Sequence, residues 1–393
     1  MPNVNLTAAQ KAKNDEFYTQ YHDIQKEINA YLEYNPNVFR GKTILLPCDD
    51  PEWSNFTKFF AQNFERFGLK KLISTSYAID SKPIKGINQL TVFEESAAHY
   101  DAKKTKKHGK IYTLDRDISG DGKVDVNDLQ WLYLEKDGDF KSSEVKRLRD
   151  EADIIITNPP FSLFRDFLAW IVEAKKEFLI IGNMNAITYK EVFPLIMQNK
   201  MWLGPTISSG DREFQVPDEY PITASGWRID KDGNKFLRVK GVRWFTNIDH
   251  GKRHQPLQLM TMADNLRFNK KLNGKTEYEH YDNYDAIEIP FTDAIPSDFD
   301  GVMGVPISFL DKYSPEQFEI VGYEKSYHLR TKIYPNQIQI DKNGKRSNVT
   351  KLNDGAAIKV PTPPDDTTCY LVDDEYFVQS YKRIFIKHRQ KTI

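Results

Sequence analysis

Short apolar runs alternate with amphipathic segments over the first 200 residues. The apolar runs are rich in branched side chains and occupy residues 43–46, 71–75, 111–112, 153–157 and 178–181. Apolar residues recur at helical spacing in segments 15–34, 56–64 and 161–175. Buried strands that alternate with helices are typical of an α/β domain with a parallel sheet. Ligands in such domains bind at the carboxyl ends of the strands.

The pattern changes after about residue 205, where Gly, Pro, Asn and Asp become frequent. The strands expected there are short, at residues 239–245, 286–289 and 318–321, and residues 342–345 resemble a hairpin turn. We therefore expect two domains, which residues 1–255 and 256–393 would form. An acidic insert at residues 115–135 interrupts the first of these domains.

Positive charge is concentrated in the C-terminal third of a nearly neutral chain. The 393 residues carry 55 Lys and Arg against 56 Asp and Glu, so the net charge is −1. This balance excludes a uniformly basic nucleic-acid coat protein but not a basic cleft. Residues 325–351 hold seven basic side chains against only Asp341, and no acid follows Glu375. Such a run fits either a DNA-binding surface or an ordinary solvated one.

Other classes of protein are excluded by what the sequence lacks. No run approaches the ~18 apolar residues of a membrane span, and the first residues have no apolar core of a secretory signal. Cys48 and Cys369 are too few for a disulfide framework. We expect a soluble, cytoplasmic protein with no membrane partner, and nothing in the sequence indicates an oligomeric state.

The most informative motif is Asn158-Pro159-Pro160-Phe161, which ends the apolar run 153–157. The two prolines fix φ and remove neighbouring donors. The Asn158 side-chain oxygen and the Pro159 carbonyl can then both accept hydrogen bonds from one planar amino group, while Phe161 lies against the attached ring. Accepting both hydrogens makes the nitrogen lone pair more nucleophilic. The alternative is an ordinary strand-to-helix turn.

This motif, in its position after a buried strand, resembles the catalytic signature of the EcoRI modification methylase family of adenine-N6 DNA methyltransferases. The resemblance covers most of residues 14–325. The matching blocks, in order, are residues 15–20, 48–51, 137–140, 158–164, 180–183, 185–187, 244–247, 282–285, 301–306 and 309–313. It implies a Rossmann-like class I methyltransferase with a mixed, mostly parallel sheet, followed by a C-terminal α+β target-recognition domain.

The resemblance also implies which residues bind S-adenosylmethionine. Phe17, Tyr18 and Thr19 would contact its methionine end, and the loop with Cys48, Asp49 and Asp50 would wrap it. Asp139 would accept from the cofactor adenine N6, and Phe140 would pack on that ring. The loop lacks the usual glycine-rich turn, and the second strand ends without the usual acidic ribose ligand, for which we assign Asp49 or Asp50. Helix capping and core packing are the alternatives for these residues.

The activity that the resemblance implies is site-specific methylation of adenine N6 in duplex DNA, with the target base flipped into the pocket. Such an enzyme would act in a bacterial or phage-infected cell, either in restriction–modification or as a solitary regulatory methylase. RNA-base and protein-glutamine methyltransferases use similar turns, and a catalytically inactive DNA-binding homologue is a further alternative. The motif ahead of the sheet and the basic C-terminal third favour DNA.

Residues 117–128 have the spacing of a calcium-binding loop and resemble a dockerin-type loop. The ligands would be Asp117, Ser119, Asp121, the Lys123 carbonyl and Asp128. The last ligand is Asp and not the usual bidentate Glu, so an acidic glycine turn is the alternative. A helix over residues 129–134 would follow, and a bound Ca²⁺ would order the loop without entering the chemistry.

Overall fold

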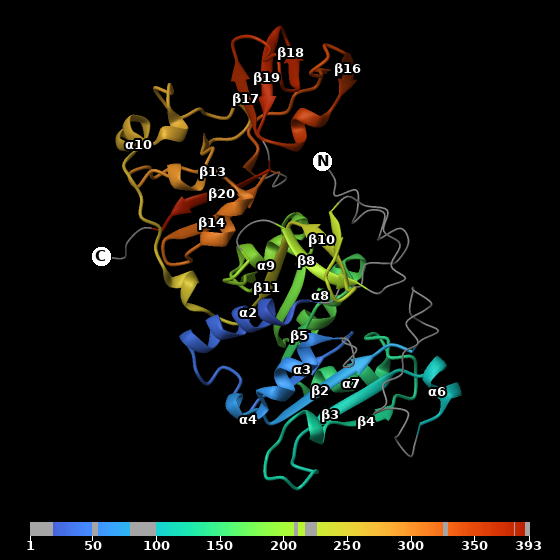
Figure 1. The fold of residues 1–393 in the computed structure, drawn as a ribbon. Coiled ribbons are helices and arrows are strands. Elements are labelled where there is room, and N and C mark those ends of the chain that lie inside the picture. Colours follow the sequence, from blue (N-terminus) through green and yellow to red (C-terminus); the bar gives the residue numbers. More distant parts are fainter. Residues whose placement is uncertain are drawn as a thin grey trace. The chain divides into compact units, whose positions relative to one another are not determined.

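The computed structural model describes residues 19–48, 54–78, 100–207, 211–216, 226–324, 329–380 and 382–389. The chain divides into two compact units, Met1–Gly251 and Lys252–Ile393 (Figure 1). Across the described ranges, no helix is both long and apolar enough to cross a membrane.

An eight-stranded sheet forms the centre of the N-terminal unit, in the order β4-β3-β2-β1-β5-β6-β11-β7. The four central strands are parallel: β2 (Lys71–Ser76), β1 (Thr43–Leu46), β5 (Ile154–Thr157) and β6 (Glu177–Asn183). Antiparallel strands flank them: β3 (Lys110–Leu114), β4 (Gln130–Tyr133), β11 (Val242–Thr246) and β7 (Trp202–Leu203). The Rossmann-like α/β fold with a mixed sheet is confirmed.

Helices pack on this sheet through apolar faces at helical spacing. They are α2 (Tyr21–Tyr34), α3 (Asn55–Gln62), α4 (Phe64–Phe67), α7 (Ser143–Glu151), α8 (Phe164–Glu173) and α9 (Phe193–Met197). The short helix α6 (Ala102–Lys107) has no apolar face and buries only Thr105. Helix α2 buries Ile24, Ile28 and Tyr31, and α3 begins where the Ser54 hydroxyl accepts the Phe56 N–H. Short 3₁₀ helices span Val126–Asp128, Phe161–Leu163 and Met184–Thr188.

Two local predictions are wrong. The single strand expected at 239–245 is two strands in different sheets, β10 (Lys235–Lys240) and β11, because Gly241 takes φ 70° between them. Strand β10 lies between β8 (Asp211–Val216) and β9 (Trp227–Ile229) in a separate sheet. The helix expected at 129–134 is strand β4, which continues the sheet beside β3.

The C-terminal unit holds two sheets, as expected of an α+β domain. One has the order β12 (Ile287–Glu288), β13 (Met303–Pro306), β20 (Arg383–His388) and β14 (Phe318–Tyr323). The other has the order β16 (Arg346–Val349), β15 (Gln337–Ile340), β18 (Cys369–Val372), β19 (Glu375–Gln379) and β17 (Ala357–Val360). Helix α10 (Met262–Phe268) and 3₁₀ helices at Gly251–His254, Lys270–Leu272, Thr292–Ala294, Ile307–Lys312 and Lys351–Asp354 complete the fold. The predicted turn at 342–345 is confirmed, since it joins β15 to β16.

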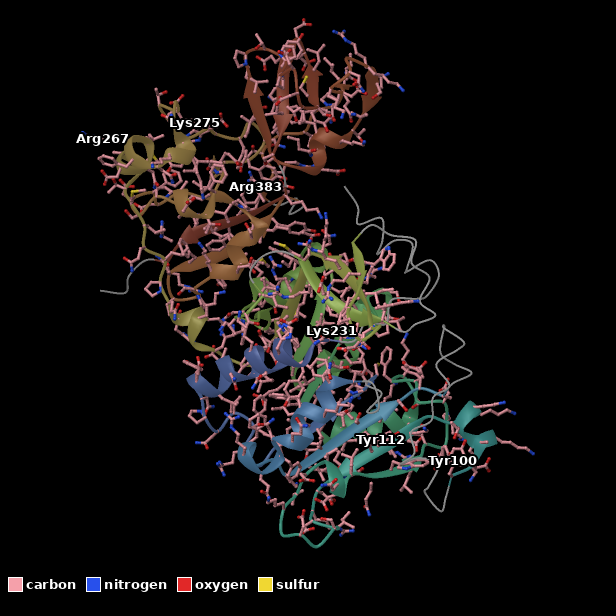
Figure 2. All side chains as sticks on the ribbon, viewed as in Figure 1. Tyr100, Tyr112, Lys231, Arg267, Lys275 and Arg383 are labelled. Carbon is pink, nitrogen blue, oxygen red and sulfur yellow. The ribbon has the colours of Figure 1, made fainter. Side chains whose placement is uncertain are left out.

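Buried charged side chains link the strands of the four-stranded sheet. Arg383, labelled in Figure 2, donates from Nε to both carboxylate oxygens of Glu288 at 3.1 and 3.0 Å. The Tyr281 hydroxyl donates to the same carboxylate. Glu324 is only 6% exposed, and its Oε1 accepts no hydrogen bond from any residue that the structure describes. Burial therefore raises the pKa of Glu324 to about 8.

Candidate active site

The carboxyl ends of two parallel strands carry the Asn158–Phe161 turn and the loop with Cys48. The Thr157 hydroxyl, at the end of β5, donates to the Pro47 carbonyl at 2.5 Å, just beyond the end of β1. This bond places the Asn158–Phe161 turn beside the loop that contains Cys48. The structure thus brings two of the predicted segments together at the edge where α/β proteins bind ligands.

The Asn158–Phe161 turn connects β5 to α8. Asn158 is partly exposed, but its Oδ1 is buried. Pro159 and Pro160 are buried, and the Pro160 carbonyl accepts the Leu163 N–H at 2.9 Å, which starts the helical turn. Phe161 is 7% exposed and belongs to the main core cluster. The prolines and the core contact therefore hold the Asn158 amide in a fixed position at the end of the strand.

Cys48 has a left-handed backbone, with φ 63°. Glycine is the residue that adopts this conformation without steric cost, so Cys48 replaces the glycine-rich turn with a strained residue. Its side chain forms a hydrogen bond with the Tyr77 hydroxyl, which lies at the end of β2. Asp49 and Asp50 lie outside the described residues, as do Phe17 and Tyr18.

Tyr77 is a site residue that the sequence analysis missed. Its hydroxyl accepts the backbone N–H of Phe140 and forms a hydrogen bond with Cys48, and its burial raises the tyrosine pKa far above the usual value. Tyr77 therefore joins the ends of β1 and β2 to the loop that holds Asp139 and Phe140. The sequence signal for Tyr77 is its position directly after the second strand, where related enzymes have the acidic residue that binds the ribose.

Asp139 and Phe140 lie in different surroundings. The Asp139 Oδ1 accepts the Lys141 N–H at 2.8 Å, and the residue is partly exposed. Phe140 is 2% exposed, and its ring packs edge-on against Phe167 and Trp170, with centroids 5.2 and 5.6 Å apart. The Phe140 ring is thus part of the core beneath α8, whereas Asp139 remains open to a ligand.

Thr19 has a buried hydroxyl suited to a polar ligand. The residue is 5% exposed, its carbonyl accepts the Asn55 side-chain N–H at 2.8 Å, and Asn55 begins α3. The Thr19 Oγ1 has no hydrogen-bond partner within the described part of the chain. Leaving a buried hydroxyl unsatisfied costs about 1–3 kcal/mol. The observation fits the expectation that Thr19 contacts the methionine end of S-adenosylmethionine.

Two glycines allow the Asp139 loop to lie against β2. The Ala78 N–H donates to the Asp137 carbonyl at 2.8 Å, and Gly138 has φ 89°. A Cβ on Gly138 would overlap the Ser76 carbonyl oxygen, and one on Gly109 would come within 2.5 Å of it. The loop can therefore keep this position only with glycine at 138.

Gly138→Ala is expected to weaken S-adenosylmethionine binding about 10-fold or more, because the loop must move away from Ser76 and carry Asp139 with it. Equilibrium titration of the cofactor measures the effect. Gly122→Ala is the matched control, since Gly122 has φ 82° with nothing within 4 Å of its Cβ position. Equal losses in both variants would mean that backbone strain alone, and not the contact with Ser76, sets the affinity.

The calcium site is not supported. Within the ranges that the structure describes, no group of three or more His, Cys, Asp or Glu side chains could hold a metal ion. Asp117 accepts from Gly120 and Gly122, and Asp121 accepts from Lys123. Three backbone N–H groups lower the pKa of Asp128 to about 2. These carboxylates, with Ser119 and Lys123 between them, form a turn closed by its own backbone, which is the alternative given by the sequence.

The fold and this strand edge define a class I methyltransferase: a Rossmann-like sheet with Asn-Pro-Pro-Phe at the end of β5. Comparison with known proteins gives the family. The chain belongs to the family described as adenine-specific methyltransferase EcoRI, whose model matches residues 5–389. The resemblance drawn from the sequence motifs is therefore confirmed, as is an enzymatic function.

Individual relatives agree with the family. The chain is 41% identical over 320 residues to the type II methyltransferase M.EcoRI of Escherichia coli. The aligned region covers 81% of this chain and 89% of the relative. It is 35% identical over 315 residues to the type II methyltransferase M.MpnI of Mycoplasma pneumoniae, which covers 80% and 83%. The type II methyltransferase M.MgeORF184P of Mycoplasma genitalium is 33% identical over 321 residues. No solved structure matches the chain.

Proposed function

We propose that the protein methylates the N6 atom of an adenine within a defined sequence of duplex DNA. The observation that carries the proposal is the Asn158–Phe161 turn, held at the end of β5 beside the Cys48 loop. The family is adenine-specific, and the relatives are named type II methyltransferases. Restriction–modification in the cytoplasm of a bacterial or phage-infected cell is the corresponding biological setting.

The chemistry follows from which groups accept hydrogen bonds. S-adenosylmethionine, when bound, supplies an electrophilic methyl group on its sulfonium sulfur. Asn158 Oδ1 and the Pro159 carbonyl accept the two hydrogens of the adenine amino group, and Phe161 lies against the base. The part of these residues would be to hold the amino nitrogen in line with the methyl group that the cofactor would supply, with its proton free to leave to solvent. These residues therefore act by positioning and electrostatics.

The cofactor-binding residues are a separate part of the proposal. Thr19 Oγ1 accepts or donates at the methionine end, the Cys48 loop borders the cofactor, and Asp139 accepts from the adenine N6 of the cofactor. Tyr77 positions both loops through its hydroxyl. Phe17, Tyr18, Asp49 and Asp50 stay predictions from the family resemblance.

The C-terminal unit is proposed to recognise the DNA target, within residues 256–393. The basic side chains of residues 325–351 and of the C-terminal tail fit a surface that binds phosphates. The target adenine lies inside the duplex, so it must be flipped into the pocket, as enzymes that modify bases in duplex DNA do.

The proposal is tested by transfer of labelled methyl groups from S-adenosylmethionine to unmethylated bacterial DNA, followed by nucleoside analysis. Label in N6-methyladenine, and nowhere else, is the expected result, and sequencing of the modified positions gives the site. Parallel reactions with RNA and with a protein lysate test the alternatives. Label confined to either of those, or no label despite bound cofactor, would overturn the assignment of DNA as substrate.

A further inference from the structure

We propose that the β15–β16 hairpin of the C-terminal unit enters the major groove of the target DNA, with Arg346 and Asn348 reading base edges. The inference rests on the proposed function and identifies the structural element that gives the methylation its sequence specificity. The hairpin spans Gln337–Ile340 and Arg346–Val349 and lies at the margin of its sheet, where β16 is the edge strand (Figure 1).

The two faces of β16 differ. Val349 is partly buried, is paired with the buried Gln337 and packs against the core cluster of this sheet, so it marks the inner face. Ser347 points to the same side by alternation but is exposed. Arg346 and Asn348 alternate with them and are exposed, opposite Ile340 and Ile338. The outer face of the edge strand therefore presents one guanidinium and one carboxamide to the surroundings.

The charge at the hairpin tip is not neutralised. Lys342, Lys345 and Arg346 are exposed, and none of the residues that the structure describes forms an ion pair with them. The one acid of the turn, Asp341, uses its Oδ1 to accept the backbone N–H groups of Asn343 and Lys345, both at 2.9 Å. This tip therefore carries three positive charges in five residues, which suits a phosphate backbone.

Two other lysines of the same unit are already paired. Around α10, Lys271 pairs with Asp293 and Lys275 pairs with Glu279, at 2.7 and 2.8 Å. Their charge is already compensated within the protein. Arg267 and Lys270, on the same elements, are exposed as well, so the hairpin is distinguished by uncompensated charge together with its position on an edge strand.

Shape and chemistry fit the major groove. The groove admits a two-stranded β-ribbon, and its base edges are read by bidentate Arg to guanine and bidentate Asn to adenine. Residues two apart on one face of a strand lie about 6.6–6.8 Å apart, which is close to two base-pair steps of 3.4 Å. Arg346 and Asn348 therefore suit two bases at that spacing, while Lys342 and Lys345 reach the flanking phosphates.

The phosphate contacts are tested with the double variant Lys342→Gln/Lys345→Gln. Loss of two contacts is expected to weaken DNA binding about 10-fold or more at 0.1 M salt, and to reduce the slope of log K against log salt by about 1.8. The control is Lys106→Gln/Lys107→Gln, which removes two exposed lysines of α6 and should leave the slope unchanged. An unchanged slope in the hairpin variant would overturn the proposal. The lysines would then serve to prevent the exposed edge strand from pairing with a strand of another molecule.

Base reading is tested with the variant Asn348→Ala. Its binding is measured to the recognition sequence of the enzyme and to every single-base variant of that sequence. Loss of about 5- to 150-fold in discrimination at one base pair is expected, with the other positions unaffected. Equal weakening on all sequences would assign Asn348 to the backbone and overturn the reading role. Failure of the wild type to methylate DNA would instead refute the proposed function, so the two failures are distinguishable.

Discussion

Replacing Asn158 with alanine is expected to lower the turnover number about 10²- to 10³-fold while cofactor affinity changes by less than about threefold. The side-chain oxygen is one of two acceptors for the target amino group, and removal of one such preorganised hydrogen-bonding group typically has an effect of this size. Asn158 follows β5 directly, whereas the proposed cofactor contacts lie on the Thr19, Cys48 and Asp139 segments. Single-turnover methyl transfer and equilibrium cofactor titration measure the two quantities separately.

Two further variants sharpen this result. Asn158→Asp keeps an acceptor at the same position and is expected to retain more activity than alanine. Asn127→Ala removes an exposed asparagine of a 3₁₀ helix and is expected to change neither quantity. Parallel losses of turnover and cofactor affinity in Asn158→Ala would contradict the role assigned to the side chain, because they would indicate collapse of the whole strand edge.

The sequence predicts those parts of the molecule in which local pattern and fold agree. The runs at 43–46, 71–75 and 153–157 become β1, β2 and β5, because strands that are buried on both faces are mostly apolar. The Asn158–Phe161 turn was found because all its residues are contiguous. The same reasoning failed at 239–245, where one glycine with positive φ divides the expected strand between two sheets.

Contacts distant in sequence could not be predicted in the same way. Tyr77 joins Cys48 to Phe140 through one hydroxyl, and Phe140 lies more than 60 positions further along the chain than Tyr77. The antiparallel orientation of β3 and β4 depends on the pairing of β3 with β2, and the local sequence of these strands gives little indication of it. The acidic loop at 117–128 matched a spacing, but spacing alone does not show that its carboxylates are occupied by backbone N–H groups.

Glu324→Gln is expected to stabilise the C-terminal unit at pH 8 and to have little effect at pH 5. Glu324 is buried at the end of β14, and the nearby guanidinium of Arg383 is already engaged by Glu288. Burial raises the pKa of Glu324 from 4.5 to about 8. The charge of Arg383 and a hydrogen bond from its backbone N–H oppose the rise, and the charge of Glu288 adds to it. The folded protein therefore holds a proton that the unfolded chain has released between these two pH values.

The sign of the pH effect follows from this difference. Because the unfolded chain binds fewer protons, the free energy of unfolding falls as pH rises from 4.5 to about 8 and then levels off. A pKa that differs by one between the folded and unfolded states corresponds to about 1.4 kcal/mol. Glutamine does not titrate, so it is expected to add on the order of 4 kcal/mol at pH 8. Urea unfolding of the full chain at pH 5 and at pH 8 measures the free energy of unfolding of each variant. Unfolding of the C-terminal unit is followed by pulsed hydrogen exchange of peptides from β14 and β20, with the same pulse pH in both series. Glu319→Gln, an exposed glutamate on the same strand, is the control. A Glu324→Gln variant that is destabilised equally at both pH values would show that a hydrogen bond holds the carboxylate in the folded state and that the group is not a neutral acid there.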